Sequence, residues 1–231
     1  MKRVGFFGAA RAIALKDLCL EWRTFETLST SLVFSLTVLV VFNFAFGLEA
    51  IKELGVARLV PGVIWIVLAF AAVVGISRSS QLERERDTLG ALILAPIDRG
   101  AIYLGKWFAN WVKLTLLELI VLPLTAVFFD FNLIELAIPM LGVVLLHSAG
   151  ITGLGTLFST MVSRIGRGEA LLATLLFPAA TPLFISAVKC TSSLLANGNL
   201  DSVHNWLGLT TGFDILYLML ALFTFEFVLE E

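Results

Sequence analysis

The stretch LSTSLVFSLTVLVVFNFAFG, Leu28–Gly47, runs for twenty residues without a charged side chain. A helix needs roughly 20 predominantly apolar residues to cross the hydrocarbon core of a bilayer. The stretch therefore predicts a membrane-spanning helix. It begins too far from the first residue, and is too long, to be a cleavable signal peptide.

The composition of the whole chain agrees with this first span. Of 231 residues, 58% are hydrophobic and 15% are charged, whereas a soluble domain is about 45–50% apolar and about 25% charged. The high fraction of hydrophobic residues, together with only six Pro, excludes an intrinsically disordered chain. A net charge of -2 without a basic run argues against a nucleic-acid partner. Cys19 and Cys190 are the only cysteines, which excludes a disulfide scaffold.

Five further segments have the apolarity of spans: Leu59–Ser77, Leu114–Phe129, Leu136–Val162, Ala170–Val188 and Trp206–Phe225. The second of these five is short unless residues 107–113 extend it. We therefore expect an all-α polytopic membrane protein with six transmembrane helices.

The basic residues predict how the spans are oriented, because cytoplasmic loops carry the excess of Lys and Arg. One side of the predicted spans holds Lys2, Arg3, Arg11, Lys16, Arg23, Arg78, Arg84, Arg86, Arg99, Lys106, Lys113, Arg164 and Arg167, and the other holds Lys52, Arg58 and Lys189. The richer side is expected to be cytoplasmic. Both termini then lie in the cytoplasm, since the number of spans is even.

Two segments outside the spans have a distinct pattern. Residues 1–27 are too polar to span and too apolar to float free, which predicts an N-terminal interfacial helix before a six-helix membrane domain at 28–231. The segment Arg78–Gly100 contains the densest charge cluster, Glu83-Arg84-Glu85-Arg86-Asp87. Leu89, Leu92 and Ile93 follow at helical spacing, and Pro96 ends the pattern. We expect a short amphipathic helix here, on the cytoplasmic face between the second and third spans.

Three ionisable side chains fall inside the predicted spans, namely Glu118, His147 and Asp214. Such groups are costly in lipid and are expected to face the protein interior or a water-filled space. They could form a proton path or a polar lining, or each could be held by a neighbouring helix.

The chain offers little for catalysis or metal binding. Gly100–Trp107 nearly matches a phosphate-binding loop, but Trp107 stands where a hydroxyl must hold magnesium. We therefore expect no nucleotide site. His147 and His204 are the only histidines and lie at different depths, so no metal site is expected.

The stretch ERERDTLGALILAP, Glu83–Pro96, is where the sequence resembles a known family. With LVPGVIW at Leu59–Trp65 and LFPAATPL at Leu176–Leu183, it resembles the CcmB family, the permeases of the cytochrome c maturation ABC transporter. These are ABC-2-type permeases. The likeness extends over essentially the whole chain from the interfacial helix onward.

The resemblance implies a non-catalytic subunit that handles neither ATP nor haem itself. ATP would be hydrolysed by the ATPase subunit CcmA. The other implied companions are CcmC, which handles haem, CcmD, and the haem chaperone CcmE on the outer side. It further implies a homodimer within the complex, in the bacterial inner membrane. The expected ATPase contact comprises the short helix and the second cytoplasmic loop: Glu83, Arg84, Glu85, Arg86, Asp87, Leu89, Leu92, Arg164 and Arg167.

Two other functions fit the same pattern. One is an ABC-2-type permease that exports a lipid, a polysaccharide or a drug. The other is a membrane scaffold that assembles a complex and transports nothing.

Overall fold

The computed structural model describes residues 5–86, 88–165, 168–197 and 203–230. The side chains at 47–52, 89, 91, 93, 164, 165, 168, 169, 197 and 226–230 lie outside that description. The described residues are helical apart from short connections. The helices are α1 (Phe6–Thr24), α2 (Glu26–Leu54), α3 (Val56–Glu85), α4 (Thr88–Leu94), α5 (Arg99–Phe129), α6 (Leu133–Ile165), α7 (Gly168–Asn197) and α8 (His204–Glu230).

Six helices are long and apolar enough to cross a membrane, judged by length and composition within the described part of the chain. The segments that qualify are Glu26–Phe46, Val56–Glu85, Arg99–Phe129, Leu133–Ser163, Ala170–Ala196 and His204–Phe225. Five of these segments contain an expected span completely, and Glu26–Phe46 contains all of Leu28–Gly47 except its last residue. The expected all-α polytopic membrane fold is confirmed.

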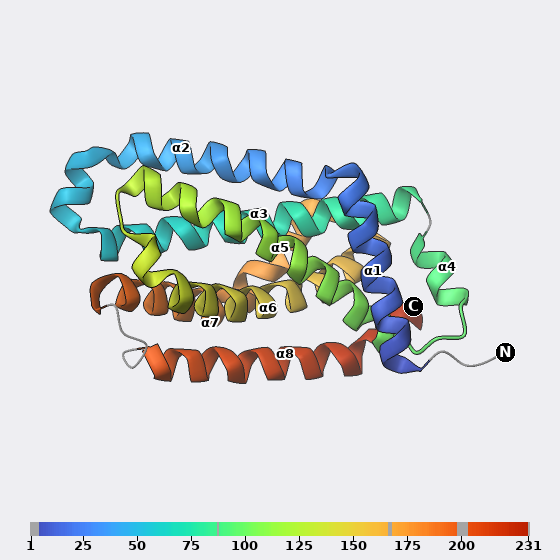
Figure 1. Ribbon diagram of the computed structural model, residues 1–231. Coiled ribbons are helices and arrows are strands. Elements are labelled where there is room, and N and C mark those ends of the chain that lie inside the picture. Colours follow the sequence, from blue (N-terminus) through green and yellow to red (C-terminus); the bar gives the residue numbers. More distant parts are fainter. Residues whose placement is uncertain (1–4, 87, 166–167, 198–202, 231) are drawn as a thin grey trace.

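The long helices run side by side, and α1 and α4 lie at one end of the bundle (Figure 1). Both termini lie at that same end. Helix α3 is the most buried span and packs against α2, α5, α6 and α7. Helices α2 and α8 lie at opposite edges, where exposed Phe44 and Phe223 have the apolar surface that lipid would cover.

Helix α1 crosses the direction of the long helices and packs on α5 (Figure 1). The chain turns from α1 into α2 at Phe25, whose φ of 52° is left-handed. Gly105 of α5 permits the contact, because a Cβ there would lie 2.7 Å from the carbonyl oxygen of Ala10. A helix that lies across the end of a bundle fits the expected interfacial location, which stays a prediction.

The second and third spans are longer than the apolar pattern predicts. Helix α3 begins at Val56, before the expected start at Leu59, and Pro61 lies inside it. The helix continues through the charged residues to Glu85. Helix α5 begins at Arg99, where the Asp98 side chain accepts a hydrogen bond from the Gly100 N–H at 2.8 Å.

These helices extend beyond the apolar pattern because apolar side chains mark only the part in contact with lipid. A helix itself continues for as long as its backbone hydrogen bonds and its packing stabilise it. As a result the expected amphipathic helix is divided. The charges at Glu83–Glu85 belong to the last turn of α3, and only Thr88–Leu94 forms the separate helix α4. Lys106 and Lys113 lie within α5, not in a connection.

Candidate functional site

The end of the bundle that carries α4 is the candidate functional site, and we call it the α4 end. It contains the last turn of α3, helix α4, the start of α5 and the adjoining ends of α6 and α7 (Figure 1). The chain ends lie there too. Most of the residues expected to contact an ATPase are therefore gathered at one end of the molecule.

The four described charges of this set point in different directions. Glu85 and Arg86 are exposed. The Arg84 guanidinium donates to the Ser163 carbonyl oxygen of α6 at 3.3 Å. Glu83 forms an ion pair with Lys106 of α5, whose side chain is 4% exposed. Two of the charges thus face outward and two hold neighbouring helices.

Leu92 anchors α4 to the bundle. Its side chain packs on a small apolar cluster, which we call the end cluster, built from Ile13, Ile102, Tyr103, Leu157, Ala221 and Phe225. The cluster joins α1, α5, α6 and α8. Consequently Leu92 joins α4 to an apolar cluster to which four other helices contribute.

Four other residues of the expected contact cannot be placed in the same way. Asp87 and Arg167 lie outside the described residues. Leu89 and Arg164 lie in described helices, but their side chains are outside the description. Their assignment as ATPase contacts stays a prediction.

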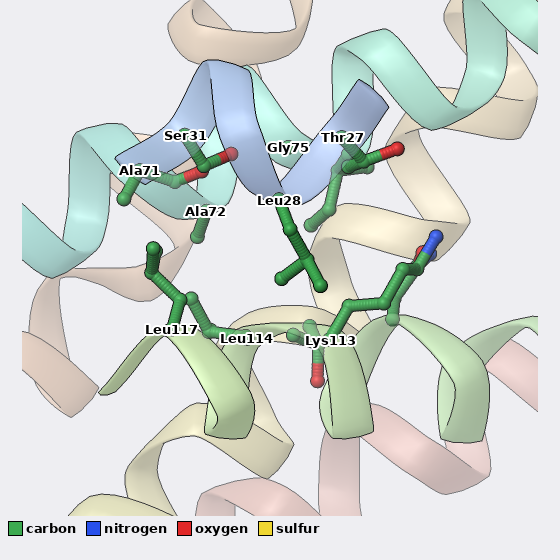
Figure 2. A pocket seen from close by; sticks show the side chains of 12 residues that line it. Thr27, Leu28, Ser31, Ala71, Ala72, Gly75, Lys113, Leu114 and Leu117 are labelled. Atoms are coloured by element: carbon green, nitrogen blue, oxygen red, sulfur yellow. The ribbon is translucent and has the colours of Figure 1, made fainter. Parts of the chain in front are cut away.

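A second lysine ties α5 to α3. The Lys113 ammonium donates to the Ser79 hydroxyl at 2.8 Å, one turn before Glu83. Figure 2 shows the Lys113 side chain beside a cavity of about 20 Å³ that is bounded by Thr27 and Ser31 of α2 and by Gly75 of α3. Such a cavity is just large enough for one water molecule. The cavity is too small to be a route for any larger molecule.

His147 has hydrogen bonds at both ring nitrogens. Its Nδ1 lies 2.7 Å from the Val143 carbonyl oxygen, which can only accept, so Nδ1 carries the proton and donates. Nε2 then accepts a hydrogen bond from the hydroxyl of Thr210 on α8 at 2.9 Å. The hydroxyl oxygen of Ser186 on α7 lies 3.3 Å from the same nitrogen. The ring of Trp65 on α3 packs against the imidazole. These contacts favour the role of a link between α6, α7 and α8.

The two intramembrane carboxylates are buried against the same helix. Glu118 of α5 is 1% exposed and lies near Ser148 of α6. Asp214 of α8 lies against Gly150 of α6, where a Cβ would come within 2.0 Å of its Oδ1. His147 lies in the same turn of α6 as Ser148 and Gly150, but each of the three groups contacts a different partner. The structure therefore does not join them into one path.

Sequence analysis missed a set of aromatic hydrogen bonds between α5 and α6. Tyr103, Trp107 and Trp111 form what we call the aromatic ladder. They donate to the carbonyl oxygens of Gly153, Ala149 and Leu145 at 3.1, 2.9 and 3.0 Å. The signal was available, because aromatic residues with N–H or O–H groups recur every four residues on one helix face.

Comparison with known proteins supplies an independent line of argument. A protein-family model described as "CcmB protein" matches residues 8–231. A relative from Rhodobacter capsulatus, named "Heme exporter protein B", is 30% identical over 179 residues, which cover 76% of this chain and 78% of the relative. A relative of the same name from Bradyrhizobium diazoefficiens is 20% identical over 187 residues, which cover 81% and 82% of the two chains.

Proposed function

The chain belongs to the CcmB family, and from this membership we propose that it is the permease subunit of an ABC transporter for haem export and cytochrome c maturation. In this role it couples ATP hydrolysis by a separate ATPase subunit to haem delivery, or to release of the haem-loaded chaperone. The relatives' shared name, "Heme exporter protein B", supports the transport role. The absence of a complete phosphate-binding loop at Gly100–Trp107 supports the separate ATPase.

The family match carries the proposal, and the structural observation that supports an ATPase contact is the pair of exposed charges, Glu85 and Arg86, at the end of α3. A subunit that receives work from an ATPase needs a contact surface that is rigidly joined to its spans. Glu85 ends the most buried span of the bundle, and Arg86 follows it directly. The adjacent α4 is held by Leu92 in the end cluster. Glu85 and Arg86 are therefore charged, exposed and rigidly connected to a span, as such a contact surface requires.

The remaining partners follow from the family. We propose that the ATPase is CcmA, that CcmC and CcmD accompany the chain in the membrane, and that CcmE acts on the outer side. Two copies of the chain pair within the complex. The α4 end faces the cytoplasm of a bacterium with this chain in its inner membrane, which agrees with the excess of Lys and Arg on that side.

Purification of the tagged chain from native membranes, followed by identification of the associated proteins, tests the proposal. We expect CcmA together with CcmC and CcmD. An ATPase without CcmC or CcmD would instead indicate an ABC-2-type exporter of another substrate. A complex whose ATP hydrolysis is the same with and without this chain would indicate a scaffold.

A further inference from the structure

In the Glu83–Lys106 ion pair the lysine is buried and the glutamate is partly buried, although Glu83 belongs to the charge cluster. The Glu83 side chain is 21% exposed and that of Lys106 is 4% exposed. A buried ammonium requires a paired anion, and removal of one partner leaves an uncompensated charge. The pair therefore differs from its exposed neighbours Glu85 and Arg86, which are free to meet another protein.

Lys113 and Ser79 extend this junction one step further along both helices. Lys113 lies two turns after Lys106 on the same face of α5, and Ser79 lies one turn before Glu83 on α3. The acidic side chains of Asp17 and Glu21 on α1 lie in the neighbourhood of Lys113. The last turns of α3 are thus joined to α5 at two points, among charges from α1.

Helix α5 is in turn joined to two other helices near the same level. Gly105, next to Lys106, allows close contact with Ala10 and Ile13 of α1. Tyr103 and Trp107 begin the aromatic ladder to α6. A displacement of the end of α3 that reaches Lys106 would therefore move α1 and α6 as well.

We infer that the Glu83–Lys106 pair transmits movement from the ATPase contact on α3 to α5, so that Glu83 is a positioning residue and not a contact. The inference rests on the proposed function. Within it, the exposed charges Glu85 and Arg86 bind the ATPase subunit, and the Glu83–Lys106 pair transmits the resulting movement into the spans.

Charge variants of the complete complex separate binding from coupling. Glu83→Gln, Lys106→Met and the exchange Glu83→Lys/Lys106→Glu change the ion pair. Glu85→Lys changes the proposed ATPase contact. Glu53→Gln is the control, because Glu53 is exposed near the end of α2, far from the α4 end. Two quantities are measured: the amount of ATPase subunit that co-purifies, and the ATP hydrolysis that depends on this chain.

We expect Glu83→Gln and Lys106→Met to retain the ATPase subunit while chain-dependent hydrolysis falls by about five- to tenfold or more, as for ordinary coupling between sites. The exchange variant should recover most of that loss. Glu85→Lys should lose the ATPase subunit, and Glu53→Gln should match the wild type.

Three results would overturn the inference while leaving the proposed function intact. The first is loss of the ATPase subunit in Glu83→Gln, which would make Glu83 a contact. The second is full hydrolysis in Glu83→Gln. The third is an exchange variant that retains the ATPase subunit but recovers no hydrolysis. If instead the wild-type chain retains no ATPase subunit, the proposed function itself is wrong.

Discussion

His147 illustrates how a titratable side chain can be accommodated in the middle of a span. Its two ring nitrogens have hydrogen-bond partners on α6, α7 and α8, and its residue is fully buried. A metal or ligand would need a free ring nitrogen, and both ring nitrogens of this imidazole have hydrogen-bond partners. We therefore predict that His147 has a structural role.

Replacement of His147 by Leu tests this role. The change removes the hydrogen bond to Thr210 and should lower the free energy of unfolding by about 0.5–2 kcal/mol, the usual range for interhelical bonds in membranes. Thermal unfolding in detergent measures the change, with Thr211→Val, at an exposed position of α8, as the control. Unchanged stability with loss of cytochrome c maturation would contradict a structural role.

Among the helices, α5 makes contacts that its apolar pattern did not predict. It packs against α1, α2, α3, α6 and α8. Lysines meet α3 on one side, and the aromatic ladder meets α6 on another. Helix α5 is therefore the element through which an event at the α4 end would spread.

The double variant Tyr103→Phe/Trp107→Phe tests the aromatic ladder. Both changes keep an aromatic ring in place but remove the donors to Gly153 and Ala149. The expected loss is about 0.5–2 kcal/mol per bond, seen as a lower thermal midpoint. A matched Phe108→Leu variant, on a partly exposed ring of the same helix, should change it less. Equal midpoints for the double variant and the wild type would show that the ladder adds no stability.

The spans and the short helix could be predicted from the sequence because they depend on local composition. Leu28–Gly47 and Trp206–Phe225 lie within helices that qualify as spans. The sequence could not predict that the Glu83 side chain points toward α5. This depends on the register between α3 and α5, which are separated along the chain. The same holds for His147, whose partners Ser186 and Thr210 belong to other helices. Long-range pairing was the missing information.

At the scale of the whole molecule, the even number of spans places both chain ends at the α4 end (Figure 1). The excess of lysines and arginines on this side predicts that this end faces the cytoplasm. The exposed charges Glu85 and Arg86 then face the compartment in which ATP is available. The proposed ATPase contact thus requires that the α4 end of the protein faces the cytoplasm.

Cysteine labelling tests the orientation independently of any partner. In a Cys19→Ser background, Glu53→Cys and Glu85→Cys place one exposed thiol at each end of the bundle. A membrane-impermeant maleimide added outside the inner membrane should label the thiol at residue 53 at once, and the thiol at residue 85 only after the membrane is made permeable. The reverse order would contradict the assigned orientation.

The central claim is that an ATPase subunit binds at the α4 end, and site-specific photo-cross-linking tests it most directly. A photoreactive side chain is introduced at Arg86, and a matched one at Ile134, which is 88% exposed at the start of α6 at the opposite end. The account predicts that cross-linking in native membranes joins residue 86, and not residue 134, to the ATPase subunit. A cross-link to that subunit from residue 134 alone, or from neither position in an assembled complex, would contradict it.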